Sequence, residues 1–407
     1  MNIGIMVSSQ TPQAGGGFTV EDDILEAFFR LRKESVHRFS LVGYGQERPA
    51  HLDSTGLPWL SLHQPRELRR KLKFSRLLHR LKLAKKKGKA LDYEAYPGLQ
   101  KQPPDLMCYL TPLIRPVADI PYITTVWDLM HRITPFFPEV SVHGEWESRE
   151  RRYREILSRA AYVLTLGRRG KEEVVDLYGV AEERVRALTL PTPGFALREG
   201  AQAREKQSLT HLGVQGDFLF YPAQFWSHKN HACVLLALRI LKEKHGFKPQ
   251  LVLTGSDKGN RSYVEQMVGD FALREQVIFA GFVSREDLTA LYRQAVALVF
   301  PSFCDPENLP PLEAFALGCP VVASAIPGHD EQLAGAALLA DPMQPELWAE
   351  AIWRLRQESG LREAQIARGR ERAVRYTADN YVADLLKIMD EFAAYRRCWA
   401  AAEAFPN

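Results

Sequence analysis

Two carboxylates separated by seven residues, Asp305 and Glu313, are the strongest candidates for chemistry in this sequence. They stand in PSFCDPENLPPLEAFALGCPVVAS (301–324), where an apolar run ends, a proline-rich loop and a helical pattern follow, and a second apolar run closes the segment. This order predicts Asp305 in a loop after a strand and Glu313 on the first turn of a helix. Taken alone, the pair is more typical of a surface carboxylate and a helix-start glutamate that the helix dipole favours, and the surrounding sequence is what points to a site.

A cationic segment, YPAQFWSHKNH (221–231), follows another apolar run. Lys229 supplies a positive charge for a diphosphate, and Gln224 and His228 are polar side chains beside it. His228 and His231 are three residues apart, a spacing that metal ligands also use, but no nearby carboxylate or cysteine completes a set. The segment therefore predicts a phosphate-binding site without a metal ion.

Three consecutive glycines, Gly15, Gly16 and Gly17, form a third candidate site. They lie in SSQTPQAGGGF (8–18), after the first apolar run and before a helical pattern. Glycine lets the backbone approach a ligand closely, and amides at a helix N-terminus favour phosphate. The spacing is not GxGxxG, so the dinucleotide-binding fingerprint is absent. A plain strand-to-helix turn explains this loop equally well.

These candidates depend on strands and helices that alternate in two series along the chain. Short apolar runs between helical patterns are typical of parallel sheets covered on both faces. We therefore predict an α/β fold with two Rossmann-like, doubly wound domains facing a central cleft, and a ligand at the carboxyl ends of the strands. The predicted strands are 3–7, 39–44, 107–110, 122–126, 162–166 and 185–190, then 218–221, 251–254, 277–280, 298–300 and 321–324.

Length and composition support this organisation. The 407 residues exceed what one hydrophobic core usually supports, and LPTPGF (190–195) punctuates the chain as a linker would. We predict one domain over 1–190, a second over 191–375, and a C-terminal helix over 376–407 that packs back toward the first. A composition with 46% hydrophobic and 25% charged residues excludes a disordered chain, a collagen and a coiled coil.

The spacing of the cysteines and the length of the apolar runs indicate the cellular compartment. Five scattered cysteines indicate neither a disulfide framework nor a zinc site, and they favour a reducing cytosol. The first twenty residues lack a basic stretch, so they do not resemble a signal peptide. No apolar run is long enough to span a bilayer. We expect a cytoplasmic protein.

Residues 66–89 form a basic segment with twelve Lys or Arg and one acid, while the whole chain has a net charge of only +4. Phe74, Leu77, Leu78 and Leu81 share one helical face within it. A basic amphipathic helix can lie on an anionic membrane surface or bind an acidic polymer. It can equally be a solvated helix packed on its own domain. A nucleic-acid partner is not expected, because no groove-reading motif appears.

The segment that begins at Pro301 resembles the signature of glycosyltransferase family 4, whose members are retaining enzymes with the two-domain glycosyltransferase B (GT-B) fold. Four other parts of the chain are similar to family segments in the same order. The residues that match the signature directly are Pro301, Ser302, Leu309, Pro310, Leu312, Glu313 and Ala314. The other similar parts are the glycine loop, VWDLMHRITPFFPE (126–139), the segment with Lys229, and VIFAGFVSREDLTALYRQA (277–295).

The resemblance implies roles for these residues. Glu313 would hold ribose hydroxyls, Asp305 the hydroxyls of the donor sugar, and Lys229 the diphosphate. The backbone from Asn308 to Pro311 would present amides to the donor. The implied donor-binding residues are Gly15, Gly16, Gly17, Gln224, His228, Lys229, Gly281, Val283, Asn308, Leu309, Pro310 and Glu313. The implied catalytic residues are Asp305, Glu313, Lys229, Asp128 and His131, and the acceptor would contact Trp127, Asp128 and Arg132.

The chain departs from the family pattern at both ends of the expected site. Asp305 replaces a glutamate, and Pro306, Glu307 and Asn308 replace Gly-Phe-Gly. Gln224 stands where an arginine is expected, and Trp127 stands where a histidine is expected. His131 follows four residues later and would substitute for that histidine if the segment is helical. These departures keep open a non-catalytic relative that binds nucleotide sugars.

We therefore expect a retaining hexosyltransferase of surface polysaccharide or lipopolysaccharide biosynthesis. A nucleotide-diphosphate sugar, with GDP-mannose favoured over a UDP-sugar, would be the donor. A saccharide or lipid-linked saccharide would be the acceptor, with no metal or other cofactor. The basic segment would place the enzyme peripherally on the inner face of the cytoplasmic membrane. A sugar-nucleotide epimerase of the same fold is the other enzymatic alternative.

The membrane prediction can be tested through the three consecutive lysines of the basic segment. Changing Lys85, Lys86 and Lys87 to glutamate should weaken sedimentation with anionic vesicles, because each basic residue near such a surface contributes about 1 kcal/mol. Neutral vesicles provide the control. Unchanged sedimentation with anionic vesicles would assign this segment to the protein's own solvated surface.

Overall fold

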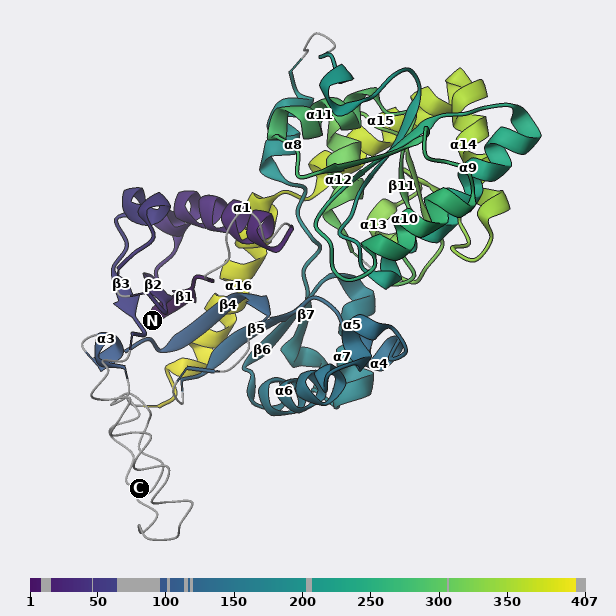
Figure 1. The fold of residues 1–407 in the computed structure, drawn as a ribbon. Helices are drawn as coiled ribbons and strands as arrows, with labels where there is room; N and C mark the ends of the chain where they lie inside the picture. Colours follow the sequence, from purple (N-terminus) through teal and green to yellow (C-terminus); the bar gives the residue numbers. More distant parts are fainter. Residues whose placement is uncertain are drawn as a thin grey trace.

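The computed structural model describes residues 1–8, 16–45, 47–63, 96–100, 103–112, 116–117, 120–202, 207–305 and 307–399. Within these ranges, the strands form two sheets of seven and six strands, and every strand pairing is parallel. Figure 1 shows the two sheets as separate α/β units joined near the centre of the molecule. The basic segment 66–89 and Gly15 lie outside the described residues.

The first sheet has the doubly wound strand order, in which the chain starts in the middle and builds outward in both directions. Its strands carry almost unbroken apolar runs because helices cover both faces of the sheet. In spatial order they are β3 (Trp59–Ser61), β2 (Arg38–Gly43), β1 (Asn2–Met6), β4 (Leu106–Pro112), β5 (Tyr122–Val126), β6 (Tyr162–Thr165) and β7 (Val185–Ala187).

The helices of the first domain include two single-turn elements near the cleft. These are α4 (Met130–Ile133) and α5 (Pro138–Ser141), which follow β5. The others before the linker are α1 (Gly16–Leu31), α3 (Pro97–Gln100), α6 (Glu145–Arg159) and α7 (Gly167–Tyr178).

The second sheet repeats the same winding. Its strands in spatial order are β10 (Val277–Gly281), β9 (Gln250–Thr254), β8 (Phe218–Pro222), β11 (Ala297–Phe300), β12 (Val321–Ser324) and β13 (Leu338–Ala340). Its helices are α8 (Gly194–Gly200), α9 (His231–His245), α10 (Arg261–Asp270), α11 (Arg285–Gln294), α12 (Leu309–Leu317), α13 (His329–Leu333), α14 (Pro345–Gln357) and α15 (Ser359–Arg375).

The chain passes between the domains near Leu190 and again near Tyr376. The two crossings touch, because the backbone N–H of Thr192 donates to the carbonyl oxygen of Tyr376 at 3.1 Å. After the second crossing, α16 (Ala378–Arg396) runs beside α1 and the first sheet (Figure 1). Ion pairs such as Arg396–Asp105 at 2.7 Å hold it there.

The predicted strands agree with the structure to within three residues at each end, but two strands were missed. Both β3 and β13 have only three residues and lie at sheet edges, so they are too short to show a pattern. The strand predicted over 185–190 ends at Ala187 because the chain then enters the linker.

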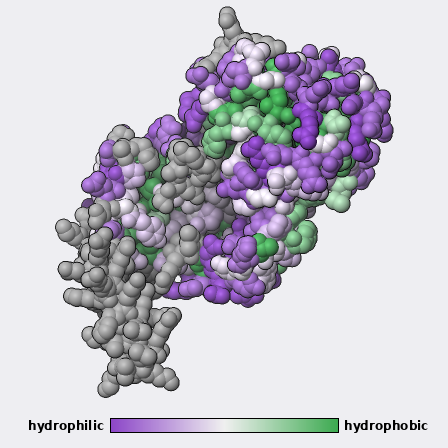
Figure 2. Space-filling view, viewed as in Figure 1, coloured by the Kyte–Doolittle hydropathy of each residue, from purple (hydrophilic) through white to green (hydrophobic). Residues whose placement is uncertain are grey.

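The outer surface of the face in Figure 2 is largely hydrophilic over the helices of both domains. Hydrophobic residues show as a patch on the second domain and a smaller one beside α4 and α5, where Ile133, Phe136 and Val142 are exposed. Along the described parts of the chain, no helix combines the length and the apolar character needed to cross a membrane.

Candidate active site

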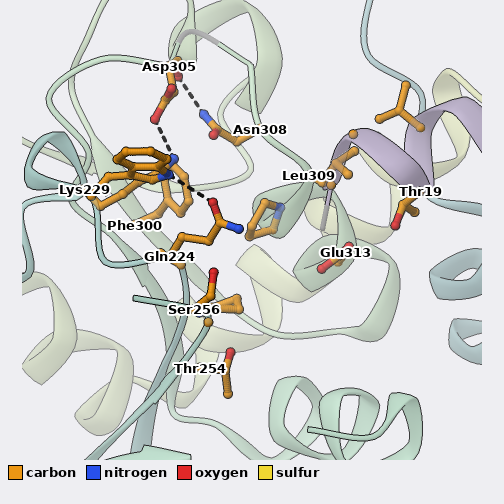
Figure 3. Close-up of a pocket in the computed structure, with 18 of the residues that line it drawn as sticks. Thr19, Gln224, Lys229, Thr254, Ser256, Phe300, Asp305, Asn308, Leu309 and Glu313 are labelled. Carbon is orange, nitrogen blue, oxygen red and sulfur yellow. Dashed lines mark hydrogen bonds and ion pairs between the residues drawn. The ribbon is translucent and has the colours of Figure 1, made fainter. Parts of the chain in front are cut away.

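A cavity of about 620 Å³ lies between the domains and is lined by residues of both. Its volume falls in the range of small-molecule sites, about 300–1,000 Å³. Figure 3 shows part of its lining. Most residues predicted from the sequence line this cavity: Gly16, Gly17, Trp127, Asp128, Gln224, His228, Lys229, Gly281, Val283, Asp305, Asn308, Leu309, Pro310 and Glu313.

The strand order explains why these residues meet. β8 and β11 are adjacent in the second sheet, and both are parallel, so the loops that follow them leave the same edge. One loop carries Gln224 to Lys229, and the other carries Asp305 to Asn308. Such a crevice at the carboxyl ends of the strands is the general ligand site of doubly wound sheets.

Asp305 and Lys229 form a partly buried ion pair. The Lys229 Nζ donates to Asp305 Oδ2 at 2.6 Å (Figure 3). Ser302 Oγ donates to the same oxygen at 2.8 Å. Burial opposes ionisation of this carboxyl, but the charges of Lys229 and His228 outweigh it and hold its pKa well below the ordinary value. Asp305 also has a φ of +89°, a strained backbone region that clusters at functional sites.

Glu313 lies on α12 and is almost fully buried at the cavity wall. Tyr292 Oη donates to its Oε2 at 2.5 Å. Burial raises the pKa of Glu313 to about 7, against the lowering effect of the Tyr292 hydrogen bond. This carboxyl therefore exchanges its proton near neutral pH and can both donate to and accept from hydroxyl groups.

The loop before α12 differs from the expectation. The backbone N–H of Asn308 donates to Gln332 Oε1 at 3.1 Å, so it is not free for a ligand. Pro310 and Pro311 have no N–H to offer. The expected row of amides from Asn308 to Pro311 is therefore wrong, and Leu309 supplies the N–H at the helix start. The Asn308 side chain instead donates to the Asp305 carbonyl oxygen at 2.6 Å.

The glutamine that replaces the expected arginine is held within its own loop. Gln224 Oε1 accepts from Trp226 Nε1 at 3.0 Å, as Figure 3 shows. This contact leaves the cavity with a neutral side chain where the family resemblance implies a cation.

The first domain supplies the opposite wall. α1 begins at Gly16, so Gly16 and Gly17 present the N-terminal end of a sixteen-residue helix to the cavity. A Cβ at Gly16 would lie 3.2 Å from Leu309 Cδ1 of the second domain, which shows how closely the domains approach. Asp128 accepts a hydrogen bond from Arg149 Nη1 at 2.7 Å, and both line the cavity.

His131 and Arg132 are not brought to this cavity. His131 is fully buried beneath it, with Nε2 at 3.0 Å from Tyr178 Oη and its ring stacked on Tyr153. Arg132 pairs with Glu150 at 3.1 Å. The suggested replacement of the missing histidine by His131 is therefore wrong, because the single turn of α4 directs that side chain into the domain core.

Four charged residues of the cavity wall were missed in the sequence. Arg149 and Glu139 come from the first domain, Arg285 begins α11, and Glu307 comes from the loop before α12. No spacing marks Arg149 or Glu139, because each acquires its role only by contact in three dimensions. Glu307 carried a signal, since it replaces a phenylalanine of the family signature.

Glu307 connects this loop to the interdomain linker. Its Oε2 accepts from the backbone N–H of Leu190 at 2.7 Å, whereas its buried Oε1 has no hydrogen-bond partner. Gly167 of the first domain lies so close to this oxygen that a side chain there would collide with it, because its Cβ would lie 2.6 Å from Oε1. Burial raises the pKa of Glu307 to about 8, only partly offset by the Leu190 hydrogen bond.

The cavity thus combines a lysine, several carboxyl groups and helix N-termini. Such a set suits a ligand with an anionic centre and many hydroxyl groups, because helix ends and lysine attract anions while carboxyls bind hydroxyls. Among the described residues, no group of three His, Cys, Asp or Glu side chains is arranged to hold a metal ion.

The chain is similar in sequence to known glycosyltransferases. Residues 205–372, which hold most of the second domain, match the family described as glycosyl transferases group 1. The chain is 27% identical over 232 residues to O-antigen chain mannosyltransferase B of Escherichia coli, which covers 57% of this chain and 61% of that protein. It is also 27% identical over 266 residues to an O-antigen chain mannosyltransferase of Salmonella typhimurium, covering 64% and 68%.

The fold comparison extends over nearly the whole chain. The structure of HepE from Anabaena in complex with UDP and glucose covers 96% of this chain and 100% of that protein, with a TM-score of 0.66 and 14% identity. This similarity confirms the GT-B fold predicted from the sequence.

The buried carboxyl of Glu307 should make stability depend on pH. Its folded-state pKa of about 8 exceeds the ordinary 4.5, so the folded protein binds a proton that the unfolded chain releases. Stability from this group is fully present below about pH 4.5 and is lost as the pH rises toward 8. Glu307→Gln does not titrate, so its melting temperature relative to wild type should rise between pH 5 and 8.

Thermal unfolding at pH 5, 6.5 and 8 measures this difference. Glu363→Gln, an exposed position on α15, is the matched control and should stay parallel to wild type. A difference between Glu307→Gln and wild type that does not change with pH would show that Glu307 is already ionised in the folded protein.

Proposed function

Because the chain belongs to the group 1 glycosyltransferases, we propose that it transfers a mannosyl group from GDP-mannose to a saccharide or lipid-linked saccharide of a surface polysaccharide. The two O-antigen mannosyltransferases support the choice of sugar and pathway. The complex of HepE with UDP and glucose supports a nucleotide sugar as donor. One observation carries the proposal: Lys229, Asp305 and Glu313 face Gly16 and Gly17 across a single cavity.

The diphosphate would be stabilised as it leaves the sugar. Lys229 Nζ, now bound to Asp305, would turn to the phosphate oxygens, and the N-terminal end of α1 would add its amides. Donors aimed at a developing charge in a water-poor site are a large source of rate enhancement. This arrangement needs no metal ion or other cofactor.

The remaining groups would bind the sugar and the nucleoside. Glu313 would accept the ribose hydroxyls, and Asp305 would bind hydroxyls of the transferred sugar. The base would lie against the backbone of Gly281 and Val283, which line the same cavity. The Leu309 N–H at the start of α12 is free of intrahelical partners and would contact the sugar or phosphate.

The reaction would proceed with retention at the anomeric carbon. An oxocarbenium-like transition state would form, and the leaving phosphate would take the proton of the acceptor hydroxyl on the same face. The protein then needs no dedicated base, so Trp127 in place of histidine does not prevent transfer. The acceptor would approach from the first domain, beside Trp127 and Asp128.

The protein would work at the inner face of the cytoplasmic membrane, held there through the basic segment 66–89.

A thermal-shift panel with GDP, UDP, ADP and their common sugar conjugates tests the donor. A ligand at a hundredfold excess over its Kd stabilises the native state by about 2.7 kcal/mol. The largest shift with GDP and GDP-mannose supports the proposal, and a larger shift with UDP or ADP conjugates overturns the choice of donor. No shift with any of them would indicate that Gln224 and Trp127 mark lost donor binding, and it would favour a non-catalytic protein that no longer binds nucleotide sugars.

Glu313→Gln tests the ribose contact. Glutamine keeps the shape and still accepts from Tyr292, but it removes the acceptor charge. Because hydrogen bonds to charged groups contribute about 1.5–3 kcal/mol, we expect GDP affinity to fall about tenfold or more, and transfer from GDP-mannose to fall with it.

Isothermal titration with GDP and a radiolabel transfer assay measure both effects. Glu275→Gln, an exposed position of the same domain, is the control and should match wild type. Wild-type affinity and turnover in Glu313→Gln would remove Glu313 from the donor site.

A further inference from the structure

The first domain places a carboxylate against the donor side of the cavity. Glu139 lies on α5 and lines the cavity, yet only 7% of its side chain is exposed. Its Oε1 accepts a hydrogen bond from the backbone N–H of His228 at 3.0 Å and also contacts Nδ1 of that ring. His228 belongs to the turn after β8, so this contact crosses from one domain to the other.

The other ring nitrogen of His228 faces a second carboxylate. His228 Nε2 lies 3.2 Å from Asp305 Oδ2. With an ionised acceptor at each nitrogen, both nitrogens must carry a hydrogen, and only the protonated imidazole does so. The charged groups that face the ring are Asp305, Glu139 and Lys229.

The charges around His228 agree with this state. Burial lowers its pKa, but Asp305 and then Glu139 outweigh burial and the repulsion from Lys229, so the pKa lies above its ordinary value. The hydrogen bonds from His228 likewise hold the pKa of Glu139 below its ordinary value, against the effect of burial.

Asp305 contacts both cations, Lys229 and the protonated His228. Lys229 Nζ and His228 Nε2 both approach the same oxygen, Oδ2. Turning Lys229 toward a diphosphate removes one of these partners. A buried carboxylate that loses its only cation is strongly destabilising, whereas one that keeps a second cation is not. His228 can fill that place only while it is protonated.

We propose that Glu139 is a positioning residue that keeps His228 protonated, so that Asp305 retains a cationic partner while Lys229 binds the donor diphosphate. The first half of this proposal, that Glu139 keeps His228 protonated, concerns the ligand-free protein. The second half, that His228 replaces Lys229 as the partner of Asp305, rests on the proposed glycosyltransferase function. The protonated ring also returns positive charge to a cavity in which Gln224 is neutral. Because Glu139 comes from the first domain, the ring is held in this state only when the domains are arranged as here.

Nuclear magnetic resonance of the imidazole nitrogens tests the first half without any ligand. The full chain is labelled with ¹⁵N-histidine, and the His228 signal is the one that disappears in His228→Gln. We expect wild-type His228 to remain protonated well above its ordinary midpoint. Removing one opposite charge within about 4–6 Å should lower the midpoint in Glu139→Gln by about one to three pH units.

Two further variants make this result specific. Glu139→Asp keeps the charge and should restore part of the shift, whereas the exposed Glu147→Gln of the same domain should leave the midpoint unchanged. Melting temperatures show that each variant is folded. An ordinary midpoint in wild type, or the same midpoint in Glu139→Gln, overturns the proposal.

GDP binding at pH 6 and pH 8 tests the second half. Glu139→Gln should weaken the Kd for GDP about tenfold at pH 8 and much less at pH 6, where solvent protons keep His228 charged without Glu139. An equal loss at both pH values would indicate a structural defect and overturn the exchange of partners. If wild type binds none of GDP, UDP and ADP, the proposed function and the role of Lys229 fail, while the imidazole titration still decides the first half.

Discussion

The carboxylate of Asp305 is the group on which the rest of this site depends. A carboxylate removed from water must be paired, and this one draws Lys229, His228 and Ser302 to a single oxygen. Those partners stand on two loops about 75 residues apart in the chain, which meet only because β8 and β11 are neighbours in a parallel sheet. The strained φ of Asp305 is part of the same arrangement, since it lets the loop turn the carboxylate back toward the lysine.

Carboxylates from both domains hold the two domains together. Glu139 and His228 join the domains inside the cavity, and Glu307 accepts from the linker at Leu190. Beyond the cavity, the Glu331 carboxylate accepts the backbone N–H of Arg168 at 3.1 Å, at the start of α7, where a helix N-terminus favours negative charge. Each contact is a directional hydrogen bond, so a change in the angle between the domains would alter its geometry. Domain arrangement and charge in the cavity are therefore coupled.

The sequence was sufficient for the parts that local patterns determine. Short apolar runs located eleven of the strands. Lys229 and Asp305 lie in loops after β8 and β11, and Glu313 lies on the helix after the second loop, so the sequence order brought all three to one crevice. The pattern could not reveal Glu139 or Arg149, because nothing near them in the chain hints at a partner in the other domain or on another helix. It misplaced His131 for a related reason. The four-residue spacing from Trp127 suggested one helical face, but α4 is only one turn long, and the ring of His131 packs on Tyr153 in the domain core. The basic segment 66–89 lies outside the described residues, so its role remains a prediction.

The ion pairs of the cavity explain why a diphosphate that binds Lys229 would do so by exchange of partners. Lys229 and His228 are matched by Asp305 and Glu139, and Arg149 is matched by Asp128. Arg285 also lines the cavity, over the ring of Phe195, and is a further cation for the anion. A diphosphate that binds Lys229 would have to take it from Asp305. The exchange with the smallest loss is the one at Asp305, because its oxygen keeps a second cation and a hydroxyl after Lys229 leaves. The N-terminal ends of α1 at Gly16 and of α12 at Leu309 add attraction for the anion through their backbone amides.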